Sequence, residues 1–312
     1  MRVAVMGSGG LGGFLGGLLA RAGEDVTLIA RGMNLQALCA KGLTVKLLPE
    51  GDFHCAVRAT DDPSEVGPVD LVWFCVKTFD LMTAARQAAP LIGPRTLILP
   101  IQNGVEAIEE LAALFGDRVL GCVSLAGATL EAPGIVAQKL PRVLVKIGER
   151  SGGSNERTES LRDTLLRAGI EAELSPDIQQ EMWEKFVVVS VTLGLTALTR
   201  LPLGPLFACA ATAALAQELM EEVASVARAK GIRLSADTAG RLFGWLRSLA
   251  EANPAARGSM YFDLAEGRRL ELEAINGAVI RMGHEVDLPT PFNTAVYAAL
   301  KPYADGAPTL PR

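Results

Sequence analysis

The chain of 312 residues is long enough for one large domain or two ordinary ones, and with 49% hydrophobic residues it can bury an aliphatic core. Its net charge of −5 and the lack of any basic run argue against nucleic acid as a partner and give no sign of an acidic membrane surface as one. Five scattered cysteines without C-x-x-C spacing and only two histidines favour reduced cytosolic thiols over disulfides, and they argue against a metal site or a histidine-based triad.

Two features bear on where the protein works. The first predicted strand begins at residue 2, which leaves no room for a signal peptide. The uncharged stretch 186–199 is too short to span a membrane. We therefore expect a cytoplasmic protein without membrane attachment.

A glycine-rich stretch follows the first predicted strand. Arg2–Met6 is a short apolar run typical of a buried strand, and residues 14–21 continue with helical spacing. Gly7, Gly9 and Gly12 fit the G-x-G-x-x-G pattern, which allows a tight turn, a close backbone approach to a pyrophosphate and close helix–strand packing. The helix N-terminus then offers N–H groups to the phosphates. The pattern predicts a dinucleotide site formed by Gly7, Ser8, Gly9, Gly10, Leu11 and Gly12, the alternative being a merely structural turn.

The end of the second predicted strand, Asp25–Ala30, bears on cofactor choice. NAD-specific folds usually place an acidic residue there for the ribose 2′-hydroxyl. Here Ala30 and Arg31 stand at this position, so no carboxylate follows the strand to repel a 2′-phosphate, and the arginine can offer it a planar fork of donors. The sequence thus favours NADP(H), although an ordinary surface arginine would look the same.

Two further apolar runs, 70–76 and 96–101, are predicted as strands of the same parallel sheet. Lys77 directly follows the first run, and Asn103 lies two residues after the second. Ligands of open parallel α/β sheets bind beyond the carboxyl ends of the strands. Either residue alone could belong to a cap or turn, but together with the glycine-rich turn and the arginine they predict a cofactor rim.

The remaining chain divides by its hydrophobic period. Further strands are predicted at 43–48, 53–59, 119–124, 135–139, 142–148 and 170–174, with helices at 33–41, 79–91 and 156–168. After residue 176 only helices are predicted, at 178–199, 206–230, 236–252, 265–282 and 292–300. The expected fold class is α/β, with a Rossmann-type dinucleotide-binding domain at 1–176 and an all-α domain at 177–312. The apolar segment 206–227 fits a core helix or a homodimer surface equally well.

Lys185 is the first candidate for chemistry in the helical half. Charged residues precede it on the predicted helix, and none follows until Arg200, so we expect solvent before the lysine and a core after it. A lysine at the rim of a cleft would suit proton transfer, because burial lowers its pKa from about 10.4 towards a useful range. A surface lysine is the alternative.

Glu271 is the second candidate. On the predicted helix 265–282 it shares a face with apolar residues, where a carboxylate needs a partner or a neutral state. It could form a helical ion pair with Arg268, or lie in a cleft where it pairs with a lysine or binds a substrate hydroxyl. Ser259, in the preceding loop, could bind a carboxylate, but the sequence favours a capping role.

Taken in order, these residues resemble the ketopantoate reductases (2-dehydropantoate 2-reductases) over essentially the whole chain. The ordered set is more specific than the glycine motif, which many dehydrogenases share. The matching segments are the glycine motif 7–12, Arg31, Cys75-Val76-Lys77-Thr78, Gln102-Asn103-Gly104-Val105, Trp183-Glu184-Lys185, Ser259-Met260-Tyr261-Phe262-Asp263 and Glu271-Leu272-Glu273-Ala274-Ile275-Asn276-Gly277.

The resemblance implies a Rossmann domain, a helical domain, NADPH as cofactor and reduction of a 2-keto acid to a 2-hydroxy acid, in that family the step that makes pantoate for pantothenate. By this analogy Lys185 is the general acid, and Glu271 supports the lysine, the substrate hydroxyl and the cofactor. Ser259 holds the substrate carboxylate, and Asn103 lies near nicotinamide and substrate. Arg31 and Lys77 serve the cofactor.

Two positions depart from the family. Its lysine helix commonly carries asparagines four and eight residues after the lysine, where this chain has Val189 and Leu193. An apolar pocket discriminates between substrates far less sharply than one built to bind a polar group. We expect the reaction type to survive, with a less polar 2-keto acid as a plausible substrate in place of ketopantoate.

Two other interpretations stay open. The protein could be ketopantoate reductase itself, with Thr192 or another group supplying the hydrogen bonds. It could also be a non-catalytic NADP(H)-sensing protein that retains the fold, although sensing does not need a proton donor.

Overall fold

The computed structural model describes residues 1–49 and 51–308. The chain divides into two compact units. Unit 1 comprises Met1–Gln102 and Ala107–Gln179, and unit 2 comprises Asn103–Glu106 and the described residues from Gln180 onward. The four residues 103–106 thus group with the helical unit, although they begin three residues after the end of a strand of unit 1.

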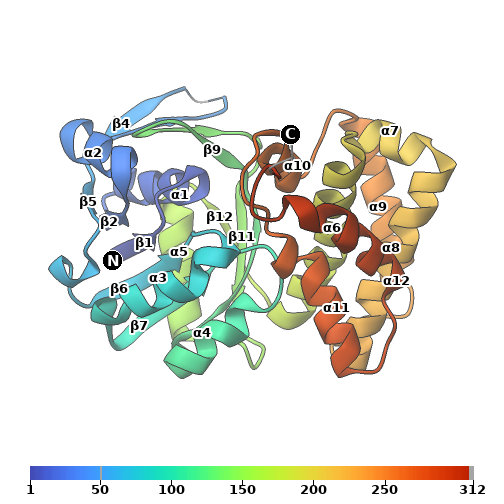
Figure 1. Ribbon diagram of the computed structural model, residues 1–312. Helices are drawn as coiled ribbons and strands as arrows, with labels where there is room; N and C mark the ends of the chain where they lie inside the picture. Colours follow the sequence, from blue (N-terminus) through green and yellow to red (C-terminus); the bar gives the residue numbers. More distant parts are fainter. Residues whose placement is uncertain (50, 309–312) are drawn as a thin grey trace. The chain divides into compact units, whose positions relative to one another are not determined.

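Unit 1 is built from three sheets and the helices that cover them (Figure 1). Its strands are β1 (Arg2–Met6), β2 (Asp25–Ile29), β3 (Leu43–Lys46), β4 (Phe53–Cys55), β5 (Arg58–Thr60), β6 (Val69–Phe74), β7 (Ile92–Pro100), β8 (Gly121–Leu125), β9 (Ala128–Ala132), β10 (Ile135–Gln138), β11 (Leu144–Gly148) and β12 (Glu171–Leu174). Its helices are α1 (Gly10–Arg21), α2 (Gly32–Lys41), α3 (Leu81–Gln87), α4 (Ala107–Phe115) and α5 (Glu156–Arg167), with the short 3₁₀ helix η2 (Thr78–Asp80) before α3.

The central sheet is parallel, in the order β5-β2-β1-β6-β7. The three inner strands β2, β1 and β6 are buried over most of their length, as in doubly wound folds with both sheet faces covered. Since β1 lies between β2 and β6, the loops that follow these three strands meet at one edge. A four-stranded sheet, β4-β3-β10-β9, and a three-stranded sheet, β12-β11-β8, complete the unit.

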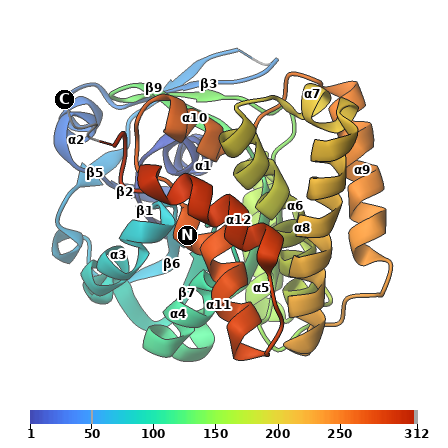
Figure 2. The ribbon, with the colours of Figure 1, turned by 45° about the vertical axis from the view of Figure 1, so that its right-hand side comes forward.

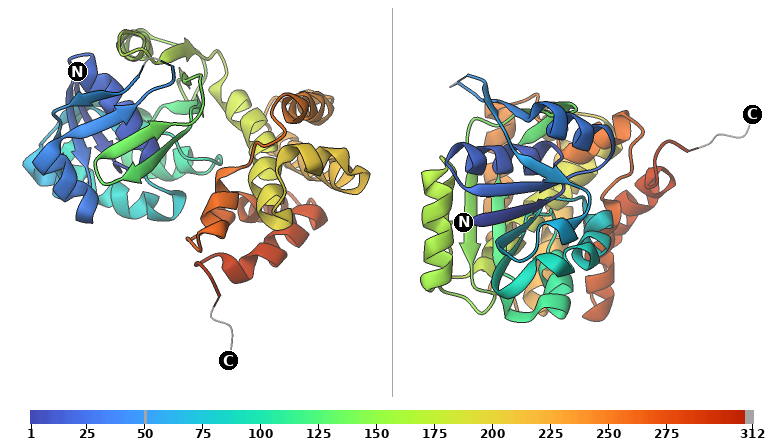
Figure 3. Two further views of the ribbon diagram at one scale, coloured as in Figure 1. Left: turned by 90° about the horizontal axis from the view of Figure 1, so that it is seen from above. Right: turned by 90° about the vertical axis from the view of Figure 1, so that its left-hand side faces the viewer.

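Helix α1 is packed between the parallel sheet and the four-stranded sheet, and its glycines make this possible (Figure 3). A Cβ on Gly16 would come within 2.7 Å of Leu28 in β2. A Cβ on Gly17 would come within 2.6 Å of Val45 in β3, on the other side. The run of glycines beyond the dinucleotide motif therefore has a structural reason, the close approach of two sheets to one helix.

Unit 2 is helical. Its elements are α6 (Ile178–Thr199, whose first two residues group with unit 1), α7 (Leu203–Ala208), α8 (Ala210–Ala229), α9 (Thr238–Ala252), α10 (Ser259–Ala265), the 3₁₀ helix η5 (Leu272–Ala274), α11 (Asn276–Glu285), α12 (Pro291–Leu300) and the 3₁₀ helix η6 (Lys301–Tyr303). Helix α8 packs against α9, α11 and α12 (Figure 2). The sequence left open whether its apolar face forms a core or a dimer surface, and the structure buries this face in the core of unit 2. A homodimer stays a prediction.

Helix α6 has the bounds predicted from sequence. It is long and apolar enough to cross a membrane by length and composition, but 67% of its apolar window is buried inside the protein, as in the core helix of a soluble protein. The expected change from solvent to core at Lys185 is wrong, because Met182 and Trp183 are buried before it. The helix is a core element along most of its length.

The architecture confirms the predicted fold class, whereas several element predictions need correction. The single helix predicted at 265–282 does not form: α10 ends at Ala265, Gly267 adopts a φ of +65°, and η5 and α11 follow separately. The strand predicted at 53–59 is two strands, and the helix at 206–230 is two helices. Strand β9 and helix α4 were missed.

The structure distinguishes two glycines of the motif by what surrounds them. A Cβ on Gly12 would lie 2.0 Å from the carbonyl oxygen of Gly7, while a Cβ on Gly9 would meet no atom within 4 Å. We expect Gly12→Ala to lower the free energy of unfolding by about 2 kcal/mol or more. Gly9→Ala, the matched control, should cost less than about 1 kcal/mol. Urea denaturation followed by circular dichroism tests this, and equal losses in both variants would contradict it.

Candidate active site

The glycine-rich turn joins β1 to α1 and leaves little room on its inner side. Gly7 has a φ of +99°, a conformation that side-chain-bearing residues rarely adopt, and a Cβ there would come within 2.8 Å of Val76. Gly12 packs against Cys75, whose thiol pKa burial raises strongly, so this cysteine stays a protonated packing residue. The first and third glycines therefore shape the turn.

The outer side of the turn is open and offers N–H groups. Gly9 is the N-cap residue of α1 and has an extended backbone, and no side chain caps the helix. A Cβ on Gly9 would meet no atom within 4 Å, so the space beside this residue is open. The first turn of α1 contains no acidic residue. By contrast, α5 is capped by the Asn155 side chain and carries Glu156 and Glu159 in its first turn. The uncapped amino end of α1 fits a pyrophosphate, because unpaired N–H groups and the helix dipole favour an anion.

Ser8 is held in place by a residue that the sequence analysis missed. The side-chain amide of Asn34 in α2 donates to the Ser8 carbonyl oxygen (2.9 Å) and to Ser8 Oγ (2.8 Å), and Asn34 Oδ1 accepts from Gly134 N–H (2.8 Å). One side chain therefore ties the turn to α2 and to the β9–β10 hairpin. An asparagine three residues after Arg31 gives no sequence signal for such a tertiary contact.

Arg31 and Lys77 lie on either side of the glycine-rich turn. Arg31 is the N-cap residue of α2, after β2, and Lys77 is the N-cap residue of η2, after β6. Arg31 is 85% exposed and forms an ion pair with Asp80 (Nη2 to Oδ2, 3.1 Å). The sequence places no carboxylate directly after β2. In the fold, however, Asp80 from the segment after β6 brings a carboxylate next to Arg31.

Gln102 links the ends of β6 and β7 in unit 1. Its side-chain amide donates to the carbonyl oxygens of Phe74 and Val76, both at 2.9 Å. These two bonds fix the backbone that leads to Lys77. The sequence analysis quoted Gln102 only as part of a motif, and a residue next to Asn103 gives no separate signal for this role.

In unit 2, α6 presents Lys185, Val189 and Leu193 at four-residue spacing, on one face of the helix. Lys185 is half-buried, while Val189 and Leu193 are 7% and 5% exposed. Eight residues of helix span about 12 Å, so the lysine lies roughly that far along the helix axis from Leu193. Next to this lysine the face is aliphatic.

Glu271 is buried, at 6% exposure, but not on a helix: it is the residue before η5. The helix-face argument for it was therefore wrong, although the buried carboxylate is real. Arg268, the alternative partner, pairs instead with Asp263 (2.9 Å) and with Glu266. The carboxylate is thus an internal group of unit 2.

Asn103 lies beside the segment that carries Glu271. Gly104, with a φ of +99°, approaches so closely that a Cβ would lie 2.8 Å from the Ala274 carbonyl oxygen in η5. Arg281 of α11 pairs with Glu106 (2.6 Å) and donates to the Glu273 carbonyl oxygen (3.0 Å). The short loop 103–106 is therefore fastened to η5 and α11.

Ser259 begins α10 and is not the cap, which is Gly258. Gly258 N–H donates to Thr196 Oγ1 (3.1 Å), and a Cβ on Gly258 would lie 2.4 Å from the Thr192 carbonyl oxygen. This contact places the backbone that precedes the exposed Ser259 beside α6, next to Leu193. A Cβ on Gly194 would in turn lie 2.8 Å from Asn276, which joins α6 to the start of α11.

The predicted residues therefore fall into two groups. The glycine-rich turn, Arg31 and Lys77 belong to unit 1. The residues predicted to serve chemistry and substrate binding belong to unit 2, where close contacts connect the segments that carry them: Asn103, Lys185, Val189, Leu193, Ser259 and Glu271.

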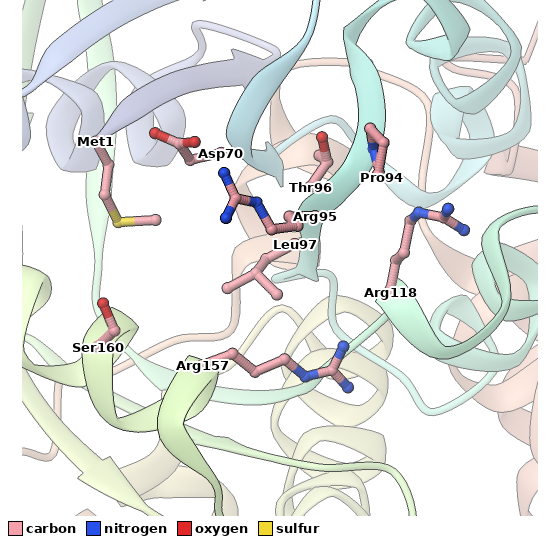
Figure 4. A pocket seen from close by; sticks show the side chains of 9 residues that line it. All are labelled: Met1, Asp70, Pro94, Arg95, Thr96, Leu97, Arg118, Arg157 and Ser160. Carbon is pink, nitrogen blue, oxygen red and sulfur yellow. The ribbon is translucent and has the colours of Figure 1, made fainter.

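A cavity of about 500 Å³ elsewhere in unit 1 contains none of these residues (Figure 4). Arg95, Arg118, Arg157 and Asp70 contribute to its lining. Arg118 donates to backbone carbonyls, and Arg157 forms a bidentate pair with Glu149. With two of three guanidinium groups already engaged and a carboxylate in the wall, we assign this cavity no role.

Comparison with known proteins identifies the family. Residues 3–152 match the family described as Ketopantoate reductase PanE/ApbA, and residues 177–304 match Ketopantoate reductase PanE/ApbA C terminal. The chain is 31% identical to the 2-dehydropantoate 2-reductase of Mesorhizobium japonicum, over 96% of its own length and 97% of the relative's. Sequence similarity therefore extends through both units.

Solved structures agree with this assignment. The crystal structure of a PanE/ApbA family ketopantoate reductase from Ralstonia eutropha JMP134 is 34% identical with a TM-score of 0.89, covering 97% of this chain and 98% of that one. A D-mandelate dehydrogenase, 23% identical with a TM-score of 0.87, covering 97% of this chain and 98% of that one, shares the fold. The chain thus belongs to the ketopantoate reductase family and is an oxidoreductase that acts on a CH–OH group.

Proposed function

We propose that this protein reduces a 2-keto acid to a 2-hydroxy acid with NADPH. The observation that carries the proposal is the uncapped amino end of α1, open at Gly9 and flanked by Arg31. It fits a pyrophosphate, and the arginine fits a 2′-phosphate. Family membership supports the same reaction.

The residues of unit 2 provide the other half of the chemistry. When bound, the nicotinamide would supply a hydride to the carbonyl carbon. Lys185 would donate a proton from Nζ to the carbonyl oxygen, and we assign the buried Glu271 carboxylate a supporting role towards the lysine and the substrate hydroxyl. Ser259 and Asn103 bind the substrate carboxylate and carbonyl region.

The substrate-binding face of α6 favours a less polar 2-keto acid than ketopantoate. Val189 and Leu193 are both buried and offer no hydrogen bond. Thr192, the alternative donor, contacts its own helix at Val189 O over 3.5 Å, the limit of a hydrogen bond. That bond is weak enough to exchange, so ketopantoate itself stays the second candidate.

A non-catalytic NADP(H)-sensing protein is the alternative from another class. The buried Glu271 argues against it, because burying a carboxylate is costly and sensing gives no reason to retain one. NADPH oxidation measured across a panel of 2-keto acids separates the three functions. Turnover of apolar keto acids, turnover of ketopantoate, or binding without turnover would identify them in that order.

We place the protein in the cytoplasm. All five cysteines are free thiols in the structure, which suits a reducing compartment.

Arg31→Ala should weaken NADPH binding much more than NADH binding. A charge-assisted contact with the 2′-phosphate is worth about 1.5–3 kcal/mol, or roughly 10- to 150-fold in affinity. Fluorescence titration with both cofactors measures this. Arg142→Ala, which breaks an exposed ion pair with Glu171, is the control and should change neither affinity. Equal losses for NADPH and NADH would remove Arg31 from phosphate recognition.

Lys185→Ala should lower kcat while leaving NADPH affinity nearly unchanged. A positioned general acid contributes about 10²- to 10⁴-fold. The matched control is Lys230→Ala, which removes a lysine paired with Glu285 on the surface of unit 2. Steady-state kinetics with a keto acid from the panel give the answer. A folded, cofactor-binding Lys185→Ala enzyme with normal kcat would exclude this role.

The wild-type enzyme should show a higher kcat/KM for an apolar branched 2-keto acid than for ketopantoate of similar size. The ketopantoate hydroxyl would be buried unpaired beside Val189 and Leu193, at a cost of about 1–3 kcal/mol. Val189→Asn combined with Leu193→Asn should shift the preference back towards ketopantoate.

Competing substrates at saturating NADPH measure this preference, and Thr192→Val tests the other donor. A wild-type preference of a hundredfold or more for ketopantoate over its deoxy analogue would contradict the argument. If Thr192→Val then abolished that preference, Thr192 would be the hydrogen-bonding group.

A further inference from the structure

Asp80 makes an interaction unusual for its position in the fold. It is the last residue of η2, three residues after the N-cap Lys77, and α3 follows without a break, so Asp80 lies in the first helical turn of this segment. Here the side chain makes no capping bond and forms its ion pair with Arg31, 49 residues earlier in the sequence. The helix dipole favours an acid in a first turn, but the ion pair with Arg31 is a separate tertiary interaction that the helix itself does not require.

The pair bridges the loops on either side of the glycine-rich turn. Arg31 follows β2, Asp80 follows β6, and β1 with its turn lies between these strands. Neighbouring strands are about 4.8 Å apart, so two side chains must reach across roughly 10 Å of sheet edge to meet. They meet over the carboxyl edge, where the adenosine end of a dinucleotide would lie.

The exposures of the two partners differ. The Arg31 side chain is 85% exposed and Asp80 is 35% exposed, so the guanidinium is far more accessible to an incoming anion than the carboxylate is. An exposed ion pair of this kind contributes little to stability. An incoming 2′-phosphate can therefore take the guanidinium from Asp80, but the carboxylate remains nearby.

We propose that Asp80 is a specificity-determining residue that limits the preference for NADPH over NADH. It competes with the 2′-phosphate for the donors of Arg31 and repels the phosphate charge. NADH has no phosphate there and does not meet this opposition. The proposal rests on the proposed function, in which Arg31 binds the 2′-phosphate.

Asp80→Asn tests the role directly, because it removes the charge and keeps the shape. With Coulomb energies of about 1 kcal/mol per charge pair at 4 Å in water, we expect NADPH to bind about three- to tenfold more tightly. NADH affinity should change less than about twofold, because NADH carries a neutral 2′-hydroxyl where NADPH carries the charged 2′-phosphate. Adenosine 2′,5′-bisphosphate and 5′-AMP, titrated by calorimetry, should show the same contrast without any turnover.

Asp163→Asn is the matched control. Asp163 forms an exposed ion pair with Arg162 on α5, so the change removes the same net charge from unit 1 away from the rim. It should leave all four affinities unchanged, and an effect like that of Asp80→Asn would reduce the result to overall charge.

Two failures are distinguishable. If Arg31→Ala weakens NADPH and NADH equally, the assignment of Arg31 in the proposed function fails. If Arg31→Ala is selective but Asp80→Asn leaves or lowers the affinity for NADPH, only the role of Asp80 is overturned, and a loss would show that Asp80 holds the guanidinium in place. Circular dichroism and the melting temperature of each variant establish that folding is intact.

Discussion

Close contact between backbones, which glycine allows because it has no side chain, is the constraint on which the predicted site residues of each unit depend. In unit 1, the third motif glycine lets α1 approach the carbonyl of the first, so the helix points its amino end out of the turn. In unit 2, Gly104 and Gly258 let two loops touch backbone on η5 and α6. A single methyl group at any of these places would separate segments that the site needs together.

Much of the fold follows from local patterns that tertiary contacts do not override. Strands β1 and β2 and helix α6 lie within one residue of their predicted bounds, and α1 ends where predicted but begins four residues earlier, inside the glycine motif. The segment 265–282 failed for the opposite reason. Its apolar spacing satisfies a helix, but Gly267 turns the chain, and the buried residues contact the core from separate short elements.

The candidate site was predictable as residue types and strand ends, but not as a network. Lys185 and Glu271 stand out as a lysine and a carboxylate in apolar surroundings, although the reason given for Glu271 assumed the wrong element. Asn34 and Asp80 gave no signal at all. Each acts through a partner 26 to 100 residues distant, and such pairs are set by sheet order and loop packing. Sequence spacing describes neighbours on one element only.

Charge explains why the site is built from helix ends as well as from side chains. A protein with net charge −5 does not attract a dinucleotide and a keto acid, both anionic, by its overall field. The attraction must be local. Helices α1 and α2 meet this need, since neither has a side-chain cap or an acidic residue in its first turn. A neighbouring carboxylate can pair with the exposed guanidinium of Arg31 and so compete with an anionic ligand. The backbone N–H groups at a helix start are fixed in place and are less easily occupied in this way. In the function that we propose, fixed backbone donors would hold the pyrophosphate of the cofactor, and discrimination between NADPH and NADH would fall to Arg31 and Asp80.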